Sequence, residues 1–326
     1  MKYSYMKFML IVVIIVVSIA TILITDKNAK LAAEQRIKIL STLDNQRSEE
    51  LLKTLSEKFP KYTFIIKKVT NHKAEKYILE GKDNIGYDFV IGVEESRVED
   101  SAQYFESYNY ESLNMLDAYK RKNKYAILAK NSSTFVVNKK LVENIPTNIE
   151  DLLKSEYKGK VAMTDYRYNA TSYAFLDYVY TKEGEKKGEK YMEKLYSLTP
   201  TFASTNDDVV NLMNKNLRTI ALLPEHMATK MIRENPDYKM LNIMQQKPYT
   251  LETIFMPINI NILPEEQEVL KEMYNYILKD FITKDRELYM KEKVSNDMQE
   301  YEIENLPMQN MYNKKLKINR LRNLTK

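Results

Sequence analysis

The sequence predicts an α/β protein with parallel strands, divided into two lobes of ordinary domain size. Two observations lead to this fold class. First, strand-like and helix-like patterns alternate between residues 37 and 93, which is typical of βαβ units. Second, the alternation returns in the second half of the chain. The length of 326 residues is sufficient for two domains, each with its own core.

The first half of the chain alternates short apolar strands with helices. Residues 37–40 and 62–69 are strand candidates, because they are rich in β-branched and aromatic residues. Between them, apolar residues recur at helical spacing from residue 50 to 59. A second helix is expected over residues 72–79, and residues 88–93 (Asp-Phe-Val-Ile-Gly-Val) form a buried strand. This order predicts parallel strands joined by helical crossovers.

The second half repeats the theme. Residues 160–163 and 219–223 are short buried strands. Helices are expected between them over residues 170–181 and 186–196, with a shorter helix near 207–214. The second half therefore supplies the elements of a second α/β lobe.

The end of the folded body is expected to return to the first lobe. Pro264 begins an amphipathic helix that runs to Phe281 with its apolar residues on one face. Two extended segments, residues 134–138 and 254–262, are the predicted crossings between the lobes.

Composition excludes several classes of protein. The chain is 44% hydrophobic and 29% charged, which is typical of a folded soluble body. It contains no cysteine, so it has no disulfide, thiolate metal site, cysteine nucleophile or lipid-attached cysteine. The net charge of +5 comes from the ends, because residues 1–25 carry +2 and residues 314–326 carry +6, which leaves −3 between them. A nucleic-acid partner is therefore not expected.

The chain begins with a membrane-targeting pattern. Lys2 and Lys7 precede an apolar run over residues 8–24, so residues 1–27 are either a signal peptide or a signal anchor. Ser18-Ile19-Ala20 is a candidate cleavage site, but cleavage would leave apolar residues at the new N-terminus. We favour an anchor with the positive end inside. Both alternatives predict that the body is extracytoplasmic.

A longer motif identifies a family. Residues 146–165 (Pro-Thr-Asn-Ile-Glu-Asp-Leu-Leu-Lys-Ser-Glu-Tyr-Lys-Gly-Lys-Val-Ala-Met-Thr-Asp) resemble the second-lobe signature of bacterial extracellular solute-binding proteins of ABC importers. The branch that they resemble binds ferric iron, polyamines, thiamine and phosphonates. The resemblance covers roughly residues 36–295, in the right order along the chain. Its other matches are Tyr87–Gly92, Asn138–Leu141, Gly184–Leu195 and Pro264–Phe281.

This resemblance implies a two-lobed periplasmic-binding-protein (Venus-flytrap) fold of type 2, with an N-terminal hydrophobic helix. Lobe 1 is then discontinuous, with residues 36–135 and 256–313, and lobe 2 comprises residues 136–255. Residues 314–326 form a basic tail, which is either a solvated end or a segment attracted to anionic lipid or wall polymer.

The chain departs from the family pattern at two places. Ile149 stands where the family usually has tryptophan, and residues 169–172 (Asn-Ala-Thr-Ser) replace a Ser-Gly-Thr loop. In relatives this loop holds the anionic group of the ligand. The new residues still donate hydrogen bonds beside the positive end of a helix. The alternative is that Asn169 is only the N-cap of that helix.

The resemblance places the ligand in a cleft lined by loops that follow strands. Each loop also has a purely structural explanation: Ser41-Thr42 and residues 204–208 are good helix caps, and the partner of Arg167 is either Asp165 or a neighbouring Glu on the surface. The predicted ligand-binding residues are Ser41, Thr42, Asn71, Gly92, Glu94, Arg167, Asn169, Thr171, Ser172, Ser204, Thr205 and Asn206.

The charge of the ligand stays open at this point. Arg167 and the hydroxyls at helix starts slightly favour an anion such as an organophosphonate. A cationic amine would instead need an aromatic and acidic cage, whose candidates are Tyr166, Tyr168, Tyr173 and Tyr178 with Glu94 and Glu95. No metal site is expected. Iron-binding relatives typically use an adjacent tyrosine pair together with His and carboxylate ligands, and this chain has His72 and His226 but no adjacent tyrosine pair.

The predicted function is capture of a small solute between two closing lobes, followed by delivery to a membrane permease with a cytoplasmic ATPase. The protein is expected to be a monomer and to need no cofactor. A membrane-anchored sensor of the same fold is the alternative, and ferric-iron or polyamine binding is the second one. An enzyme is not expected, because no Ser-His-Asp set, Walker loop or dinucleotide fingerprint occurs.

Overall fold

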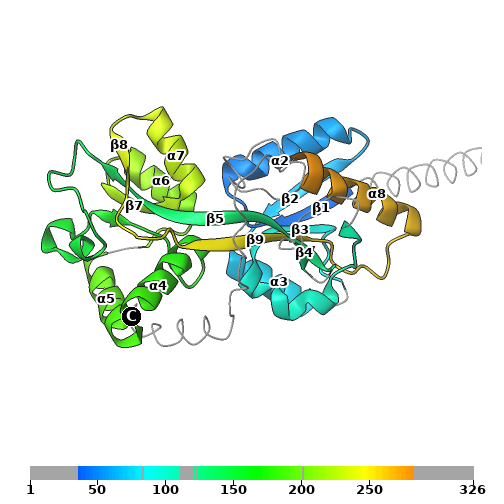
Figure 1. The fold of residues 1–326 in the computed structure, drawn as a ribbon. Coiled ribbons are helices and arrows are strands. Elements are labelled where there is room, and N and C mark those ends of the chain that lie inside the picture. Colours follow the sequence, from blue (N-terminus) through cyan, green and yellow to red (C-terminus); the bar gives the residue numbers. More distant parts are fainter. Residues whose placement is uncertain (1–35, 82–83, 111–119, 122, 200–201, 282–326) are drawn as a thin grey trace, which may run out of the picture.

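The computed structural model describes residues 36–81, 84–110, 120–121, 123–199 and 202–281. In this part of the chain two α/β lobes stand side by side and are joined by two long strands (Figure 1). The predicted N-terminal helix, the basic tail and the end of lobe 1 after residue 281 lie outside the described residues. Among the described helices, none has the length and apolar character that a bilayer span requires.

Lobe 1 has three parallel strands, as its sequence pattern predicts. Strand β1 (Arg36–Ser41) lies between β2 (Thr63–Lys68) and β3 (Phe89–Glu94), and both pairings are parallel. Helices α2 (Asn45–Lys58) and α3 (Asn71–Gly81) make the crossovers. Because the strands are parallel, the loops after β1, β2 and β3 leave the same edge of the sheet.

Two long antiparallel strands connect the lobes. In β5 (Tyr125–Asn138), residues up to Ser132 pair with β9 (Tyr249–Phe255), whereas residues from Ser133 pair with strands of lobe 2. Strand β9 also pairs with β3 of lobe 1. The change of partner at residues 132–133 therefore comes before the predicted crossing at 134–138. The crossing predicted at 254–262 also lies too far along the chain, because Ile254 and Phe255 already pair with β3.

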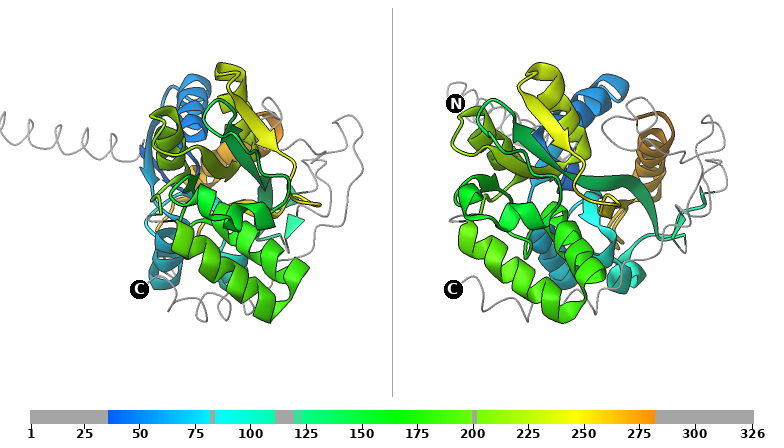
Figure 2. Two further views of the ribbon diagram at one scale, coloured as in Figure 1. Left: turned by 90° about the vertical axis from the view of Figure 1, so that its left-hand side faces the viewer. Right: turned by 60° about the vertical axis from the view of Figure 1, so that its left-hand side comes forward.

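Lobe 2 has a sheet covered by helices on both faces. Helices α4 and α5, which lie side by side in Figure 2, cover one face, and α6 and α7 cover the other. The elements are β6 (Val161–Ala162), α4 (Ala170–Glu183), α5 (Glu185–Leu198), α6 (Asn206–Asn214), β7 (Ile220–Pro224), α7 (Glu225–Glu234) and β8 (Tyr238–Leu241). The predictions for α4, α5 and α6 are confirmed to within a few residues, and α7 begins where Pro224-Glu225 before His226 indicated a helix start.

The alternation of side chains along β5 and β7 explains how one sheet has two cores. Phe135 and Ile220 belong to the core beneath α4 and α5. Their neighbours Val136 and Ala221 belong to the core beneath α6 and α7. Successive strand residues point to opposite faces, so an apolar run fills both layers.

The remaining elements are the last helix of lobe 1, a short strand beside β5 and short turns in both lobes. Helix α8 (Pro264–Tyr276) continues into the π-helical turn η7 (Ile277–Phe281), and both pack on the lobe 1 core as predicted. Short 3-10 turns are η1 (Glu95–Arg97), η2 (Glu99–Tyr104), η5 (Glu150–Leu153) and η6 (Ser155–Tyr157), and β4 (Lys120–Arg121) pairs with β5.

Candidate functional site

A cleft of about 290 Å³ lies between the two lobes, beside the connecting strands. Its wall comes from four segments of lobes 1 and 2, residues 42–47, 68–73, 168–171 and 204–207. Asn131 of β5, Glu252 of β9 and Pro224 at the end of β7 complete the wall. The cleft is thus placed where loops follow strands, the usual ligand position in open α/β sheets.

Five helices begin in the wall of this cleft. The lining includes the N-cap residues of α2, α4, α6 and α7 and the first residue of α3. The first turn of an α-helix leaves backbone N–H groups without intrahelical partners and carries partial positive charge. The helix starts together give the cleft a positive potential that does not depend on side chains.

A buried charge network forms the floor. Arg47 of α2 is buried, and its guanidinium binds both carboxylate oxygens of Glu252, at 2.5 and 2.9 Å. Its Nε donates to Asp44 Oδ2 at 2.6 Å, and Asn131 Nδ2 donates to Glu252 Oε1 at 3.1 Å. A buried guanidinium needs such partners, because an unpaired charge in this position is strongly destabilising. The floor is therefore fixed before any ligand arrives.

Asp44 connects the charge network of lobe 1 to lobe 2. It is the N-cap of α2, where its Oδ1 accepts from the backbone N–H of Arg47 at 3.0 Å. Its Oδ2 also lies 3.0 Å from Nε2 of His226 at the start of α7. Burial alone would raise the pKa of Asp44, but the charge of Arg47 and the hydrogen bond to His226 lower this pKa well below its ordinary value.

The lobes touch each other on both sides of the cleft. On one side, besides the contact of Asp44 with His226, Asp207 Oδ2 accepts from the backbone N–H of Asn45 at 3.4 Å. On the other side, the side chain of Arg97 donates to the backbone carbonyl of Arg167 at 3.3 Å. Contacts on two sides of one cleft are those of a closed two-lobed protein.

Lobe 2 contributes hydroxyl and amide groups. Asn169 caps α4 by accepting from the backbone N–H of Thr171 at 2.9 Å. Thr171 is buried, and its Oγ1 accepts from Asn206 Nδ2 at 3.1 Å. Thr205 caps α6 through a capping box with Asp208. The two explanations for Asn169 are thus compatible, because the N-cap itself lies in the cleft wall.

The structure brings seven of the twelve predicted ligand-binding residues into this wall and leaves five outside it. Contact with a ligand stays a prediction for all of them. The seven are Thr42, Asn71, Asn169, Thr171, Ser204, Thr205 and Asn206. The five are Ser41, Gly92, Glu94, Arg167 and Ser172.

Four of these five have polar partners within the protein. Ser41 Oγ accepts from the backbone N–H of Leu43, and Ser172 shares a hydrogen bond with Thr164 at 2.8 Å. Buried Glu94 binds Ser96 and Arg97. Arg167 pairs with Asp165, as the structural alternative predicts.

Gly92 lies against the loop that carries Thr42 into the cleft wall. Its φ is +84°, and a Cβ at this position would lie 2.6 Å from Leu43 Cδ2 and 2.9 Å from Thr42 Oγ1. A side chain would therefore displace the loop that carries Thr42 into the wall.

The predicted aromatic cage is not assembled. Tyr166 and Tyr173 are buried in lobe 2, and the hydroxyl of Tyr178 accepts from the backbone N–H of Gln245 at 3.1 Å. Of the four tyrosines, Tyr168 alone lines the cleft, and Glu94 and Glu95 are buried outside it.

Sequence inspection missed most of the charged lining. The missed residues are Asp44, Arg47, Lys68, Lys73 and Glu252, whereas Asp207 lies within the predicted loop at 204–208. One indication was available: Glu252 interrupts the apolar run Thr-Leu-Glu-Thr-Ile-Phe of β9, and a carboxylate within a buried strand needs a partner. That partner, Arg47, lies 205 residues earlier.

The comparison with family models identifies one family. A family model described as bacterial extracellular solute-binding protein matches residues 96–302. A search of curated protein sequences gives no match.

Solved structures share the fold at low identity. AfuA from Actinobacillus pleuropneumoniae, a periplasmic binding protein with fructose-6-phosphate bound, is 16% identical with a TM-score of 0.69 over 89% of this chain and 96% of its own. Iron-bound HitA from Pseudomonas aeruginosa is 14% identical with a TM-score of 0.68, over 89% and 99%. A two-component system protein that mediates signal transduction is 16% identical with a TM-score of 0.65, over 81% and 88%. At such identities the likeness establishes the two-lobed fold, and the ligand has to be argued from the cleft.

Proposed function

Because this chain belongs to the bacterial extracellular solute-binding proteins, we propose that it captures a small anionic solute between its lobes and delivers it to a membrane permease with a cytoplasmic ATPase. Family membership accounts for the capture of a solute outside the cytoplasm. Two points go beyond family membership: the negative charge of the solute and its delivery to a permease.

The convergence of five helix starts on one cleft carries the proposal of an anion. Backbone N–H groups at helix N-termini point along the helix axis and bind phosphate, sulfate or carboxylate groups directly. Since the helices come from both lobes, an anion between them gains contacts from both lobes only when the cleft is closed.

The charged side chains are consistent with this sign. The carboxylates of Asp44 and Glu252 already share the guanidinium of Arg47, so they do not need a cation from the solute. Lys68 and Lys73 lie in the wall against one further carboxylate, that of Asp207. The three positive side chains and the three carboxylates of the wall balance in formal charge, so the five positive helix ends disfavour an organic cation.

The connecting strands suggest how the cleft opens. We propose that lobe 1 and lobe 2 rotate about the short stretch where β5 changes partner, between Ser132 and Ser133, and about the start of β9 at Tyr249. The solute would shift the population toward the closed form, which then docks on the permease.

Ligand screening of the 326-residue chain tests the proposal. Thermal unfolding is measured with phosphonates, sugar phosphates, thiamine, polyamines and iron chelates. A bound anion at one hundred times its Kd should stabilise the protein by about 2.7 kcal/mol, and a Thr171→Ala/Ser204→Ala variant should lose this stabilisation. If a polyamine stabilises the protein and no anion does, the proposal is wrong.

A sensor is the second candidate function. It is favoured by the structural neighbour that is described as mediating two-component signal transduction and by the predicted anchor over residues 8–24. The measurement that separates the two functions is uptake of the radiolabelled solute in cells without this chain. Loss of uptake supports delivery to a permease, whereas normal uptake with altered transcription supports sensing.

The membrane attachment is also proposed. We expect residues 1–27 to remain as an anchor, with the body outside the cytoplasmic membrane. N-terminal sequencing of the chain from membrane and soluble fractions tests this, because an N-terminus after Ala20 in the soluble fraction would show cleavage instead.

A further inference from the structure

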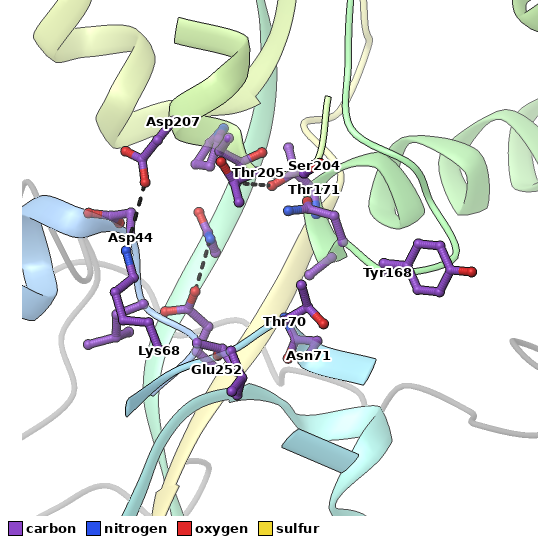
Figure 3. A pocket seen from close by; sticks show the side chains of 18 of the residues that line it. Asp44, Lys68, Thr70, Asn71, Tyr168, Thr171, Ser204, Thr205, Asp207 and Glu252 are labelled. Atoms are coloured by element: carbon purple, nitrogen blue, oxygen red, sulfur yellow. Dashed lines mark hydrogen bonds and ion pairs between the residues drawn. The ribbon is translucent and has the colours of Figure 1, made fainter. Parts of the chain in front are cut away.

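The cleft has two chemically different ends (Figure 3). Three carboxylates, those of Asp44, Asp207 and Glu252, gather at one end, together with Lys68. We call this the acidic end. The opposite end, which we call the hydroxyl end, is lined by Thr70, Asn71, Thr171, Ser204 and Thr205.

The carboxylates of the acidic end can accept hydrogen bonds, and two of them already have a positively charged partner. Asp44 and Glu252 are held by Arg47, at distances between 2.5 and 2.9 Å. The contacts of Asp207 are longer, at 3.4 Å to the backbone N–H of Asn45 and 3.9 Å to Lys68 Nζ. Asp207 therefore retains acceptor capacity that a solute can use.

The electrostatics at this end disfavour a second anionic group. The three carboxylates outnumber the positive charges of Arg47 and Lys68, so an anion would be repelled there. A hydroxyl group donates a hydrogen bond to a carboxylate without this repulsion, and Arg47 and Lys68 reduce the gain that an ammonium group would have.

The hydroxyl end suits the anionic group. Helices α3, α4 and α6 begin beside these residues, and Lys73 of the lining lies in the first turn of α3. Backbone N–H groups, hydroxyls and an ammonium group are the donors that an oxyanion requires.

Two buried acceptor atoms add to this pattern. Thr42 Oγ1 and Asn206 Oδ1 line the cleft from opposite lobes and have no hydrogen-bond partner within the described structure. An amide oxygen only accepts, so Asn206 Oδ1 requires a donor from the solute or from a water molecule.

The volume of the cleft sets the size of the solute. The space of about 290 Å³ lies at the lower end of the range for small-molecule sites. A bare tetrahedral oxyanion has five heavy atoms and is too small to contact both ends of such a cleft.

We propose that the solute is a polyhydroxylated anion, for which ribose 5-phosphate and gluconate are suitable probes. Its anionic group lies at the hydroxyl end, and its hydroxyls donate to Asp207 and the other carboxylates of the acidic end. This assignment rests on the proposed capture of an anion and adds the orientation and the class of the solute.

The test is isothermal titration calorimetry of the 326-residue chain with matched probes. Ribose 5-phosphate and pentyl phosphate carry the same anionic group and differ in their hydroxyls, and gluconate replaces the phosphate by a carboxylate. D-Ribose and O-phosphoethanolamine test the neutral and the ammonium-bearing alternatives. We expect at least one hydroxylated anion to bind tenfold or more tightly than pentyl phosphate, D-ribose and O-phosphoethanolamine.

The variant Asp207→Asn tests the orientation. It removes the carboxylate charge but keeps the shape, and the capping box of α6 uses Asp208 instead. Affinity for the hydroxylated anion should fall at least tenfold, whereas affinity for pentyl phosphate should not fall, because the variant removes a negative charge from the cleft. Thr171→Val, at the other end, should weaken both.

The outcomes separate the two proposals. Equal affinity for pentyl phosphate and the hydroxylated anions, or tighter binding of O-phosphoethanolamine, overturns the assignment of the solute class and leaves anion capture standing. If Asp207→Asn weakens pentyl phosphate as much as the hydroxylated anion, the orientation is wrong. If no anionic probe binds, the proposed function itself fails.

Discussion

The two lobes contribute different chemistry to the same cleft. Lobe 1 presents the charged side chains of Asp44, Arg47, Lys68 and Lys73 besides the polar residues Thr42, Thr70 and Asn71, whereas lobe 2 presents mainly hydroxyls and amides, with Asp207 as its single charged lining residue among those described. The charges of lobe 1 are tied to the connecting strand β9 through Glu252. One lobe thus holds a fixed electrostatic floor, and the other brings neutral hydrogen-bonding groups to it.

This difference suggests a division of labour. Changes in the lobe 1 network should mainly affect folding, because its charges are buried and paired with one another. Changes at the helix starts of lobe 2 should mainly affect binding, because their groups are exposed to the cleft. Variants in the two regions should therefore separate an effect on the free energy of unfolding from an effect on affinity for the solute.

Glu252→Ala should have the largest effect on stability. It removes the bidentate partner of buried Arg47, whose ion pair with Asp44 remains, so we expect a loss of about 3 kcal/mol. Urea-induced unfolding measures this loss. Glu268→Ala is the matched control, since Glu268 forms an exposed pair with Lys271 at 2.7 Å and should cost less than about 0.5 kcal/mol. Equal losses for both variants would mean that the floor is not a structural unit.

The second prediction concerns pH. The pKa of Asp44 is depressed in the folded protein, so its stabilisation is present above its unfolded pKa of about 3.9 and is lost as pH falls below that value. Asp44→Asn keeps the N-cap but removes the charge beside Arg47 and His226. The variant should be less stable by about 2 kcal/mol at pH 7.

This difference should narrow by up to about 1.4 kcal/mol for each pH unit below 4. Urea unfolding of both proteins at pH 7, 5, 3.5 and 2.5 measures it. The raised pKa of Asp207, caused by burial and then by the charge of Asp44, works in the opposite direction, so Asp207→Asn in both backgrounds isolates the contribution of Asp44. A constant difference across this pH range would exclude the proposed role of the Asp44 charge.

The contrast between the lobes also explains what could be predicted from the sequence. The hydroxyl and amide residues of lobe 2 follow local rules, since Asn169 and Thr205 are N-caps that a helix start reveals. The strands of lobe 1 were equally visible from their apolar runs. Both features depend on neighbours within a few positions along the chain.

The charged floor depends on topology instead. Arg47 looks like any charged residue on an amphipathic helix until β9 is placed between β3 and β5, which brings Glu252 beneath it. The sequence contains no local pattern for a contact over 205 residues. The crossings were predicted a few residues too late for a related reason, because β5 is one continuous extended run whose change of partner leaves no mark in its apolar pattern.

The third prediction separates capping from binding at one residue of lobe 2. Asn169→Asp keeps an oxygen that accepts from the backbone N–H of Thr171, and aspartate is as good an N-cap as asparagine. Stability should therefore change by less than about 0.5 kcal/mol. The new charge faces the cleft and should lower the affinity for an anion about tenfold or more. Calorimetry with ribose 5-phosphate checks this, and unchanged affinity would leave Asn169 as a cap alone.

The smallest effect is expected where the lobes meet. His226→Ala removes the contact between α7 and Asp44 across the cleft, while Asp44 keeps its partner Arg47. The cleft of the variant should be open more often. Because apparent affinity scales with the population of the closed form, the affinity for the solute should fall about two- to fivefold. The unfolding free energy should change little. Small-angle scattering without ligand provides an independent readout, since the variant should be more extended than the parent protein. Lys230→Ala, at an exposed position of the same helix, is the control. Identical scattering for the two variants would mean that His226 does not hold the lobes together, and closure would then depend on the solute alone.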